Sequence, residues 1–187
     1  MPNIYAIDAH GVWTGATREI GPKEGRPRGW IASDTPPPEG AVVQWAGEWR
    51  VLTGADLAQI TEARRVKAFS LINAERERRL ASGSAFPVAG IADPVPLQGR
   101  PFDQTVYLAL LTRASGYKAA GITDPILTLR DAADVIHALT PDQMIDLVAQ
   151  AMAWFEGVMA ASWSMKDGTG AFTGGIPFDF TDDRHWP

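Results

Sequence analysis

A long helical segment between two unlike regions is the feature that most restricts the fold. Thr53 is placed to cap it, Asp56 lies three residues on near the positive helix end, and Gly83 marks its stop. From Asp56 to Ser82 the helix spans roughly 27 residues, or about 40 Å, which exceeds an ordinary globular helix. Six basic and four acidic residues give it a charge of +2 in an acidic protein. Such helices usually join modules or bundle with copies of themselves, so we assign residues 53–83 as a long connecting helix.

The first 52 residues predict a small β module. They hold six of the fourteen prolines and four of the seven tryptophans, without helical periodicity. Two β-prone runs flank Gly47 within residues 42–52, where glycine supplies the positive φ of a hairpin turn, and a second hairpin is expected around residues 9–11. A unit of about 50 residues buries little surface alone, so its tryptophans must pack inward or against a partner. This candidate interaction surface consists of Trp13, Trp30, Trp45 and Trp49.

Residues 84–167 predict a compact α+β domain. Apolar spacing indicates a helix over residues 103–114, and two β-prone runs indicate a hairpin around residues 131–133. Residues 93–97 are too rich in proline for an internal strand and are expected to form a loop. The last helix has the clearest start, because Thr140, Pro141 and Gln143 occupy the N-cap, N1 and N3 positions of a capping box. The fold class is therefore α+β.

The last segment, residues 168–187, is rich in glycine and aromatic residues and has no regular period. Counted from Asp167 it carries four acidic residues and one basic residue, a charge of −3, opposite in sign to the long helix. We expect an extended tail that finds no core within the chain and docks on a partner. Deleting residues 172–187 should then leave the core folded and abolish docking. The predicted docking side chains are Phe172, Ile176, Phe178, Phe180 and Trp186.

The composition limits the function classes. With 187 residues, of which 45% are hydrophobic and 21% charged, the chain can bury a sizeable core. The absence of cysteine excludes disulfides, thiolate zinc sites and cysteine nucleophiles. A net charge of −5 argues against a general nucleic-acid binder. No apolar run of about 18 residues indicates a membrane span, and the first residues lack the basic and apolar regions of a secretory signal.

Chemistry at a catalytic or metal site would have to use His10, His137 or His185 with carboxylates. The acidic residues near His10 and His185 lack the helical i, i+3 or i, i+4 spacing of strong metal motifs. His137 fits a hydrogen-bonded, half-buried strand residue better than an acid or base. No nucleophile elbow, phosphate-binding loop or HExxH motif occurs. We therefore expect neither an enzyme nor a bound metal or other cofactor.

Two segments carry a resemblance to proteins of tailed bacteriophages. Residues 34–51 contain three consecutive prolines, a glycine and the sequence WAGEW, and look like the N-terminal unit of tail-fibre and tail-fibre-assembly proteins. Residues 72–83, INAERERRLASG, are followed by a helix, a hairpin and the helix that opens at Leu139-Thr140, and are similar to an uncharacterised C-terminal domain of tail-fibre-region proteins. The resemblance covers most of residues 34–167, departs at the proline-rich residues 93–101, and implies no catalytic residues.

The resemblance and the residue patterns lead to one leading hypothesis. We expect a non-enzymatic structural component of the virion tail, joining the tail tip or baseplate to fibre or receptor-binding subunits during host attachment. A tail-fibre assembly chaperone in the host cytoplasm is the alternative, and a carbohydrate-binding module built on the N-terminal tryptophans is a second. The expected partners are other phage tail proteins and copies of this chain, a trimer being one option. Neither nucleic acid nor a membrane span is expected.

Overall fold

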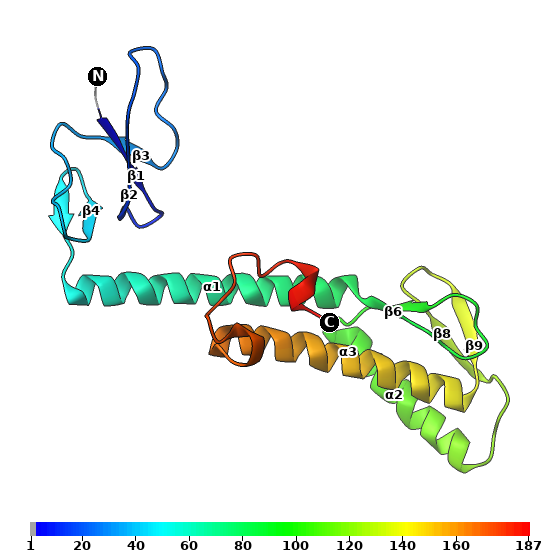
Figure 1. The fold of residues 1–187 in the computed structure, drawn as a ribbon. Helices are drawn as coiled ribbons and strands as arrows, with labels where there is room; N and C mark the ends of the chain where they lie inside the picture. The colour runs from blue at the N-terminus through cyan, green and yellow to red at the C-terminus, as the bar shows by residue number, and fades with distance from the viewer. Residues whose placement is uncertain (1–2) are drawn as a thin grey trace. The chain divides into compact units, whose positions relative to one another are not determined.

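A computed structural model describes residues 3–187, and its fold is α+β (Figure 1). Helices hold 44% of the chain and strands 19%, which confirms the predicted fold class. The chain divides into two compact units, an N-terminal unit that ends at Lys67 and a C-terminal unit, Ala68–Pro187. The boundary lies inside helix α1 (Gly54–Ser82), whereas the sequence placed divisions at both ends of that helix.

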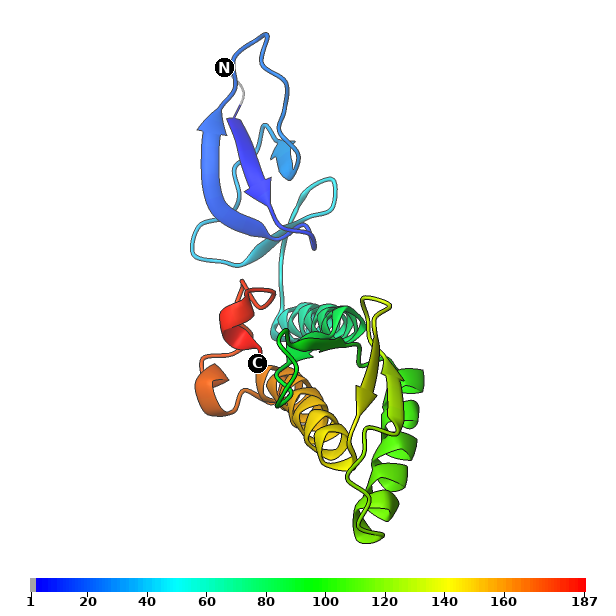
Figure 2. The ribbon, with the colours of Figure 1, turned by 90° about the vertical axis from the view of Figure 1, so that its right-hand side faces the viewer.

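The N-terminal unit is built from short antiparallel strands (Figure 2). β1 lies between β2 and β3 in one sheet, while β4 and β5 form a separate hairpin. These pairings confirm both predicted hairpins, and Gly47 has the expected positive φ, +93°, in the second of them. The strands are β1 (Asn3–Ile7), β2 (Trp13–Glu19), β3 (Trp30–Ala32), β4 (Val43–Trp45) and β5 (Trp49–Val51).

Helix α1 has 29 residues and is closed at both ends by local features. The Thr53 backbone N–H donates to Asp56 Oδ2 at 2.8 Å, and the Asp56 backbone N–H donates to Thr53 Oγ1 at 3.2 Å. Gly83 ends the helix with φ +77°, and a Cβ there would lie 2.0 Å from the Leu97 carbonyl oxygen. Only glycine fits this position, because the backbone at Leu97 passes directly over it.

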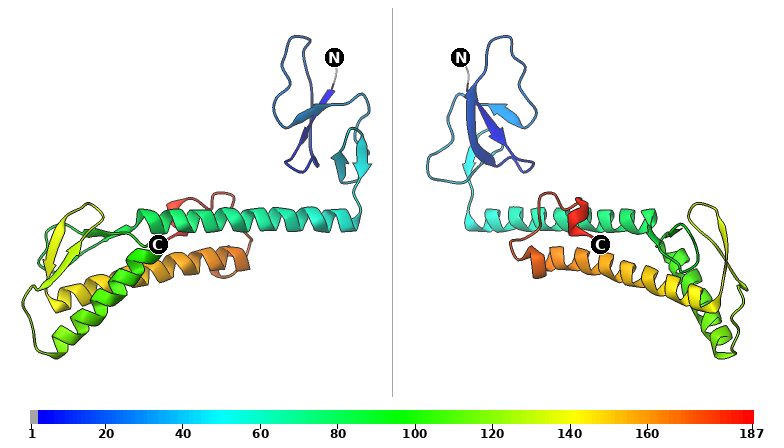
Figure 3. Two further views of the ribbon diagram at one scale, coloured as in Figure 1. Left: turned by 180° about the vertical axis from the view of Figure 1, so that it is seen from behind. Right: turned by 45° about the vertical axis from the view of Figure 1, so that its right-hand side comes forward.

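The C-terminal unit packs two further helices against two β-hairpins (Figure 3). The predicted helix, the hairpin around residues 131–133 and the capped final helix are all present, and Thr140 Oγ1 accepts from the Gln143 backbone N–H at 3.2 Å. β6 pairs with β7, β8 pairs with β9, and α2 packs against α3. The elements are β6 (Ser84–Phe86), β7 (Val95–Leu97), α2 (Pro101–Ala119), β8 (Leu127–Arg130), β9 (Ile136–Leu139) and α3 (Pro141–Asp167).

The loop predicted for residues 93–97 is wrong at residues 95–97, which form β7, while residues 93 and 94 lie outside any strand. Pro96 lies opposite Ala85 in a two-stranded hairpin, where a missing N–H does not interrupt a central strand of a larger sheet. The Pro96 carbonyl accepts from the Ala132 backbone N–H at 2.9 Å, so its remaining polar group is paired. Val95 and Leu97 on either side are only 0% and 1% exposed. Burial of these two side chains outweighs the low strand propensity of proline.

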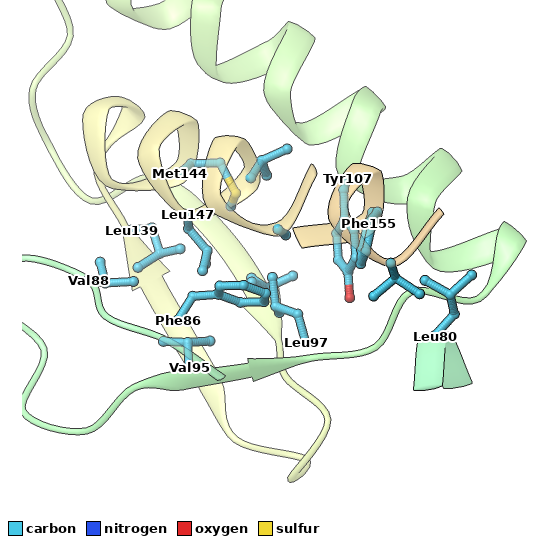
Figure 4. Close-up of a cluster of buried hydrophobic side chains, with 14 of the residues drawn as sticks. Leu80, Phe86, Val88, Val95, Leu97, Tyr107, Leu139, Met144, Leu147 and Phe155 are labelled. Atoms are coloured by element: carbon cyan, nitrogen blue, oxygen red, sulfur yellow. The ribbon is translucent and has the colours of Figure 1, made fainter. Parts of the chain in front are cut away.

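The core of the C-terminal unit lies between α3, the hairpins and α2 (Figure 4). α3 presents Met144, Leu147 and Phe155 to this core, and Tyr107 enters it from α2. The hairpins close it from the other side. They contribute Phe86, Val95, Leu97, Leu127, Leu129 and Leu139.

Within the segment Pro141–Phe172, an 18-residue window with a mean hydropathy of 1.2 meets the length and composition of a membrane span. The sequence was expected to contain no such run of about 18 residues, and by length and composition alone this window is one. Met144, Leu147 and Val148 on α3 are each 0% exposed within the core of the C-terminal unit. A core helix passes the same test of length and composition, and 33% of this window is buried inside the protein.

Candidate interaction site

An apolar groove lies among the three helices of the C-terminal unit and has a volume of about 370 Å³. We call it the helical groove. Residues from the C-terminal part of α1, the first turn of α2 and the middle of α3 form its walls, so every contributor is part of one compact unit. The lining residues are Arg76, Glu77, Leu80, Pro101, Gln104, Met152, Phe155, Glu156, Met159 and Trp163.

Contacts between α2 and α3 set the floor of the groove. The Tyr107 and Phe155 rings stack with centroids 6.4 Å apart and an interplanar angle of 22°. Gly99, just before α2, allows the chain to approach this stack, because a Cβ there would lie 2.5 Å from Phe155 Cε1. Gln104 Nε2 then donates to the Gly99 carbonyl at 2.6 Å and holds the start of α2 in place. The groove is therefore built by packed, hydrogen-bonded elements.

The α3 wall of the groove is a second apolar stripe beside the one that faces the core. Met152, Met159 and Trp163 recur at helical spacing, and Trp163 is 51% exposed. Methionine side chains are flexible and polarizable, so such a wall can adapt to the shape of a partner. An exposed tryptophan beside them is the type of residue that dominates binding energy in protein interfaces.

Charged groups lie along the edges of the groove rather than at a reactive centre. Arg76 Nη2 pairs with the Glu77 carboxylate at 2.6 Å, while Glu156 has no ion-pair partner within residues 3–187. Burial raises the pKa of Tyr107 to about 12, so this phenol stays neutral at physiological pH. An apolar surface with one free carboxylate suits binding of another chain.

The C-terminal tail differs from its prediction. Trp186 is buried at 7% exposure, its Nε1–H donates to the Phe180 carbonyl at 2.7 Å, and Phe172, Ile176 and Phe180 pack half-buried against the core. The expectation that the five tail side chains find no core is therefore wrong for these four. Phe178 alone fits it, with 98% of its surface exposed. A partner-binding role for the five side chains stays a prediction.

A set of contacts from α1 and α3 explains why the tail docks within its own unit. Arg79 donates to the Thr181 carbonyl at 2.8 Å, to Asp183 Oδ1 at 2.9 Å and, through Nε, to Glu75 Oε1 at 2.8 Å. Trp154 Nε1 donates to the Pro187 carbonyl at 3.3 Å. We call these contacts the tail clasp.

Glu75 anchors the tail clasp from within α1, where it is 7% exposed. Its carboxylate accepts from Arg78 at 2.6 Å as well as from Arg79. The hydrogen bond from Arg78, assisted by Arg79 and opposed by burial, holds the pKa of Glu75 below its ordinary value. The carboxylate therefore stays ionised and keeps Arg79 aimed at the tail.

The four N-terminal tryptophans do not all line one cleft. Trp45 and Trp49 meet edge to face with ring centroids 5.1 Å apart, and both line a cleft of about 500 Å³. Trp13 is not among the residues that line this cleft, and its Nε1–H donates to the Ala16 carbonyl at 3.2 Å within β2. Trp30 lies on β3 under the Arg18 guanidinium, 5.6 Å from the ring centroid. Only Trp45 and Trp49 remain together as a candidate binding surface.

The cleft beside Trp45 and Trp49 is more polar than the helical groove. Trp49 Nε1 donates to the Thr35 carbonyl at 2.8 Å, which ties the proline-rich segment to the β4–β5 hairpin. Two carboxylates, Asp34 and Glu48, line the cleft, and no lysine or arginine does. The cleft therefore offers aromatic rings and hydrogen-bond acceptors to a ligand. Its remaining lining residues are Ala32, Ser33, Pro36, Pro38 and Gly47.

Each of the three histidines makes a hydrogen-bond contact with a nearby aspartate. His137 Nε2 lies 2.7 Å from Asp131 Oδ2 on half-buried β9, which confirms the hydrogen-bonded strand residue predicted there. His185 Nε2 lies 3.0 Å from Asp179 Oδ1 in the tail, and the His10 backbone N–H donates to Asp8. No group of three or more metal-ligating side chains comes together in residues 3–187.

Sequence reasoning did not identify the α3 wall of the helical groove. Met152, Glu156, Met159 and Trp163 follow i, i+4, i+7, i+11 spacing next to the core stripe, so α3 is apolar over more than one face. That breadth was the available signal. A broad apolar surface on a helix does not by itself indicate a binding site, because the sequence does not reveal which part of that surface neighbouring elements cover.

Comparison with known proteins places the C-terminal unit in a family. Residues 62–182 match the family described as Domain of unknown function (DUF4376), and this range contains the whole helical groove. No curated protein and no solved structure matches the chain. Since the match takes in well over half of the sequence, the chain belongs to the DUF4376 family.

Proposed function

We propose that this chain is a non-enzymatic structural component of a phage or phage-like tail, joining the tail tip or baseplate to fibre or receptor-binding subunits. The observation that carries the proposal is the helical groove, an apolar surface that the chain builds but does not fill. The phage setting is supported by the resemblance of residues 34–51 and 72–83 to tail-fibre-region proteins. The virion tail is then the place where the protein resides.

The groove supports protein binding because large apolar side chains are exposed in the same unit, Trp163 within the groove and others outside it. Phe102 is 77% exposed, Leu108 49% and Trp163 51% in the same unit. Soluble monomers rarely expose contiguous apolar patches, and those that do generally use them as interaction sites. An enzyme would instead need a reactive set of groups, and the groove offers one unpaired carboxylate among apolar side chains.

An adaptor also needs a second surface, and the N-terminal unit provides a candidate. Its cleft carries Trp45 and Trp49, whereas the groove belongs to the other compact unit. Two compact units with different surfaces suit a chain that contacts two different partners. The groove and the cleft would then bind different subunits of the tail.

Mass spectrometry of purified particles tests the proposal. We expect the chain to be present at a fixed ratio to other tail subunits, and Trp163→Ser to reduce its incorporation. Val135→Ser is a matched control, because Val135 is 50% exposed and lies outside the groove. A chain that is needed for fibre folding but missing from particles would instead be an assembly chaperone, and normal incorporation of the Trp163 variant would contradict the assigned role of the groove.

Carbohydrate binding is a second candidate function, favoured by the cleft of the N-terminal unit. Aromatic rings with neighbouring carboxylates can stack on a sugar and accept from its hydroxyl groups. A glycan array separates this function from a purely protein-binding one. Binding should be lost in Trp45→Ala and kept in Trp13→Ala, since Trp13 does not line the cleft.

A further inference from the structure

Helix α2 carries an exposed stripe that the fold of its own unit does not use. Phe102, Val106, Ala109 and Arg113 follow i, i+4, i+7, i+11 spacing, which places them on one side of the helix. All four are exposed, Phe102 at 77% and Val106 at 37%. The buried residues of α2, Tyr107 and Ala114, lie on another side of the helix. A helix that is apolar on both sides normally has a neighbour on both sides. We call these four residues the α2 stripe.

The α2 stripe ends in a charge that lacks a counterion. Arg113 donates to the Tyr117 hydroxyl at 2.9 Å and lies over its ring, but it has no acidic partner within residues 3–187. The helical groove shows the opposite arrangement. Its α3 wall is apolar except for Glu156, which has no basic partner within the same described range. In the part of the chain that the structure describes, one surface thus carries a cation without an acidic partner, and the other carries an anion without a basic partner.

The two surfaces also match in length. The α2 stripe runs over eleven residues from Phe102 to Arg113, and the α3 wall runs over eleven from Met152 to Trp163, each roughly 16 Å along a helix. Pro101 and Gln104 already form a wall of the groove, so α2 cannot turn its outer stripe into the groove of its own chain. The stripe can reach such a groove only on another molecule.

We propose that the α2 stripe of one copy of this chain occupies the helical groove of a second copy. An antiparallel arrangement of α2 on α3 brings Phe102 next to Trp163 of the partner subunit and Arg113 about one helical turn from Glu156 of the partner subunit. The apolar contact supplies the main attraction, and the charge pair fixes direction and register. Because stripe and groove are different surfaces, the contact is heterologous, and repeating it produces a closed ring when the rotation between copies allows closure.

Light scattering and sedimentation of the full-length chain over a concentration series test this inference. The unmodified chain should form a discrete oligomer, and Phe102→Asp should be monomeric. Arg113→Glu and Glu156→Arg should each weaken association about tenfold or more, and the double charge reversal should restore it. Val135→Asp is the control, since this residue is 50% exposed outside both surfaces and should leave the mass unchanged. Circular dichroism verifies folding of each variant.

Two results would overturn the inference. The first is a chain that remains monomeric at every concentration while its groove binds a different tail protein, which would leave the proposed tail function intact. The second is an oligomer whose association does not change in either single charge-reversal variant. Failure of the double reversal to restore association would count in the same way. If Phe102→Asp does not fold, the charge reversals still decide the question, because Arg113 and Glu156 are exposed and neither side chain is part of the buried core.

Discussion

The guanidinium carbon of Arg79 lies 5.0 Å from the centroid of the Trp186 ring, so helix α1 holds the end of the chain through a cation–π contact. The same guanidinium bonds Glu75 and Asp183. The tail is therefore part of the C-terminal unit, and the contacts that it still offers to a partner are few. Because these contacts lie within one chain, the tail clasp can be tested by measuring the stability of the isolated protein.

Replacing Arg79 by alanine should destabilise the C-terminal unit by about 2–3 kcal/mol, because a side chain that is only 11% exposed loses several charge-assisted hydrogen bonds. Urea denaturation gives the free energy of unfolding, and limited proteolysis should show faster cleavage after residue 168. Arg78→Ala is the matched control, since that side chain is 58% exposed and should cost less than about 1 kcal/mol. Equal losses for both variants would argue against the clasp.

Two tail aromatics should behave in opposite ways. Trp186→Ala should cost about 3–5 kcal/mol because it empties a buried site, whereas Phe178→Ala should change stability by less than about 0.5 kcal/mol. Thermal unfolding of the two variants measures the difference. By the same reasoning, deletion of residues 172–187 should destabilise the unit, contrary to the expectation from sequence. A truncated chain as stable as the full one would show that the tail does not dock.

Whether a feature could be predicted from the sequence depends on how far apart its interacting residues lie along the chain. Thr140 and Gln143 lie three residues apart, and their capping box was predicted because it depends on local geometry alone. Trp186 could not be placed, since its contact with Arg79 joins residues more than a hundred positions apart. The β7 strand was missed for a similar reason, because burial of Val95 and Leu97 depends on distant core residues. The helical groove combines residues from three helices that lie far apart in the sequence.

Substitutions of two glycines should have opposite signs. Gly83→Ala should destabilise the protein by about 3 kcal/mol or more, since φ is +77° and the new Cβ would lie 2.0 Å from the Leu97 carbonyl oxygen. Gly116→Ala within α2 should stabilise by about 1 kcal/mol, because a Cβ there meets no other atom within 4 Å. Chemical denaturation of both variants tests the prediction. A neutral Gly83→Ala would mean that the start of β6 does not pass under Leu97.

The β8–β9 hairpin should lose stability in acid through Asp131. Burial alone would raise the pKa of this carboxyl, but hydrogen bonds from His137 and from the Val135 and Ala133 amides lower it below its ordinary value of 3.8. A lowered folded pKa contributes stability that is complete above the ordinary value and is lost as pH falls through the folded pKa. Unfolding followed from neutral pH to about pH 3 should show this loss, and Asp131→Asn should show a smaller one. Identical pH profiles would contradict the assignment.

Photo-crosslinking inside assembled particles tests the central claim, that the helical groove is covered by another protein chain. A photoreactive phenylalanine at position 163 should link to a tail subunit or to a second copy of the chain, and the same group at position 135 should not, because Val135 lies outside the groove. If particles containing the chain show no linkage from position 163, or show equal linkage from both positions, then the groove is not a docking surface.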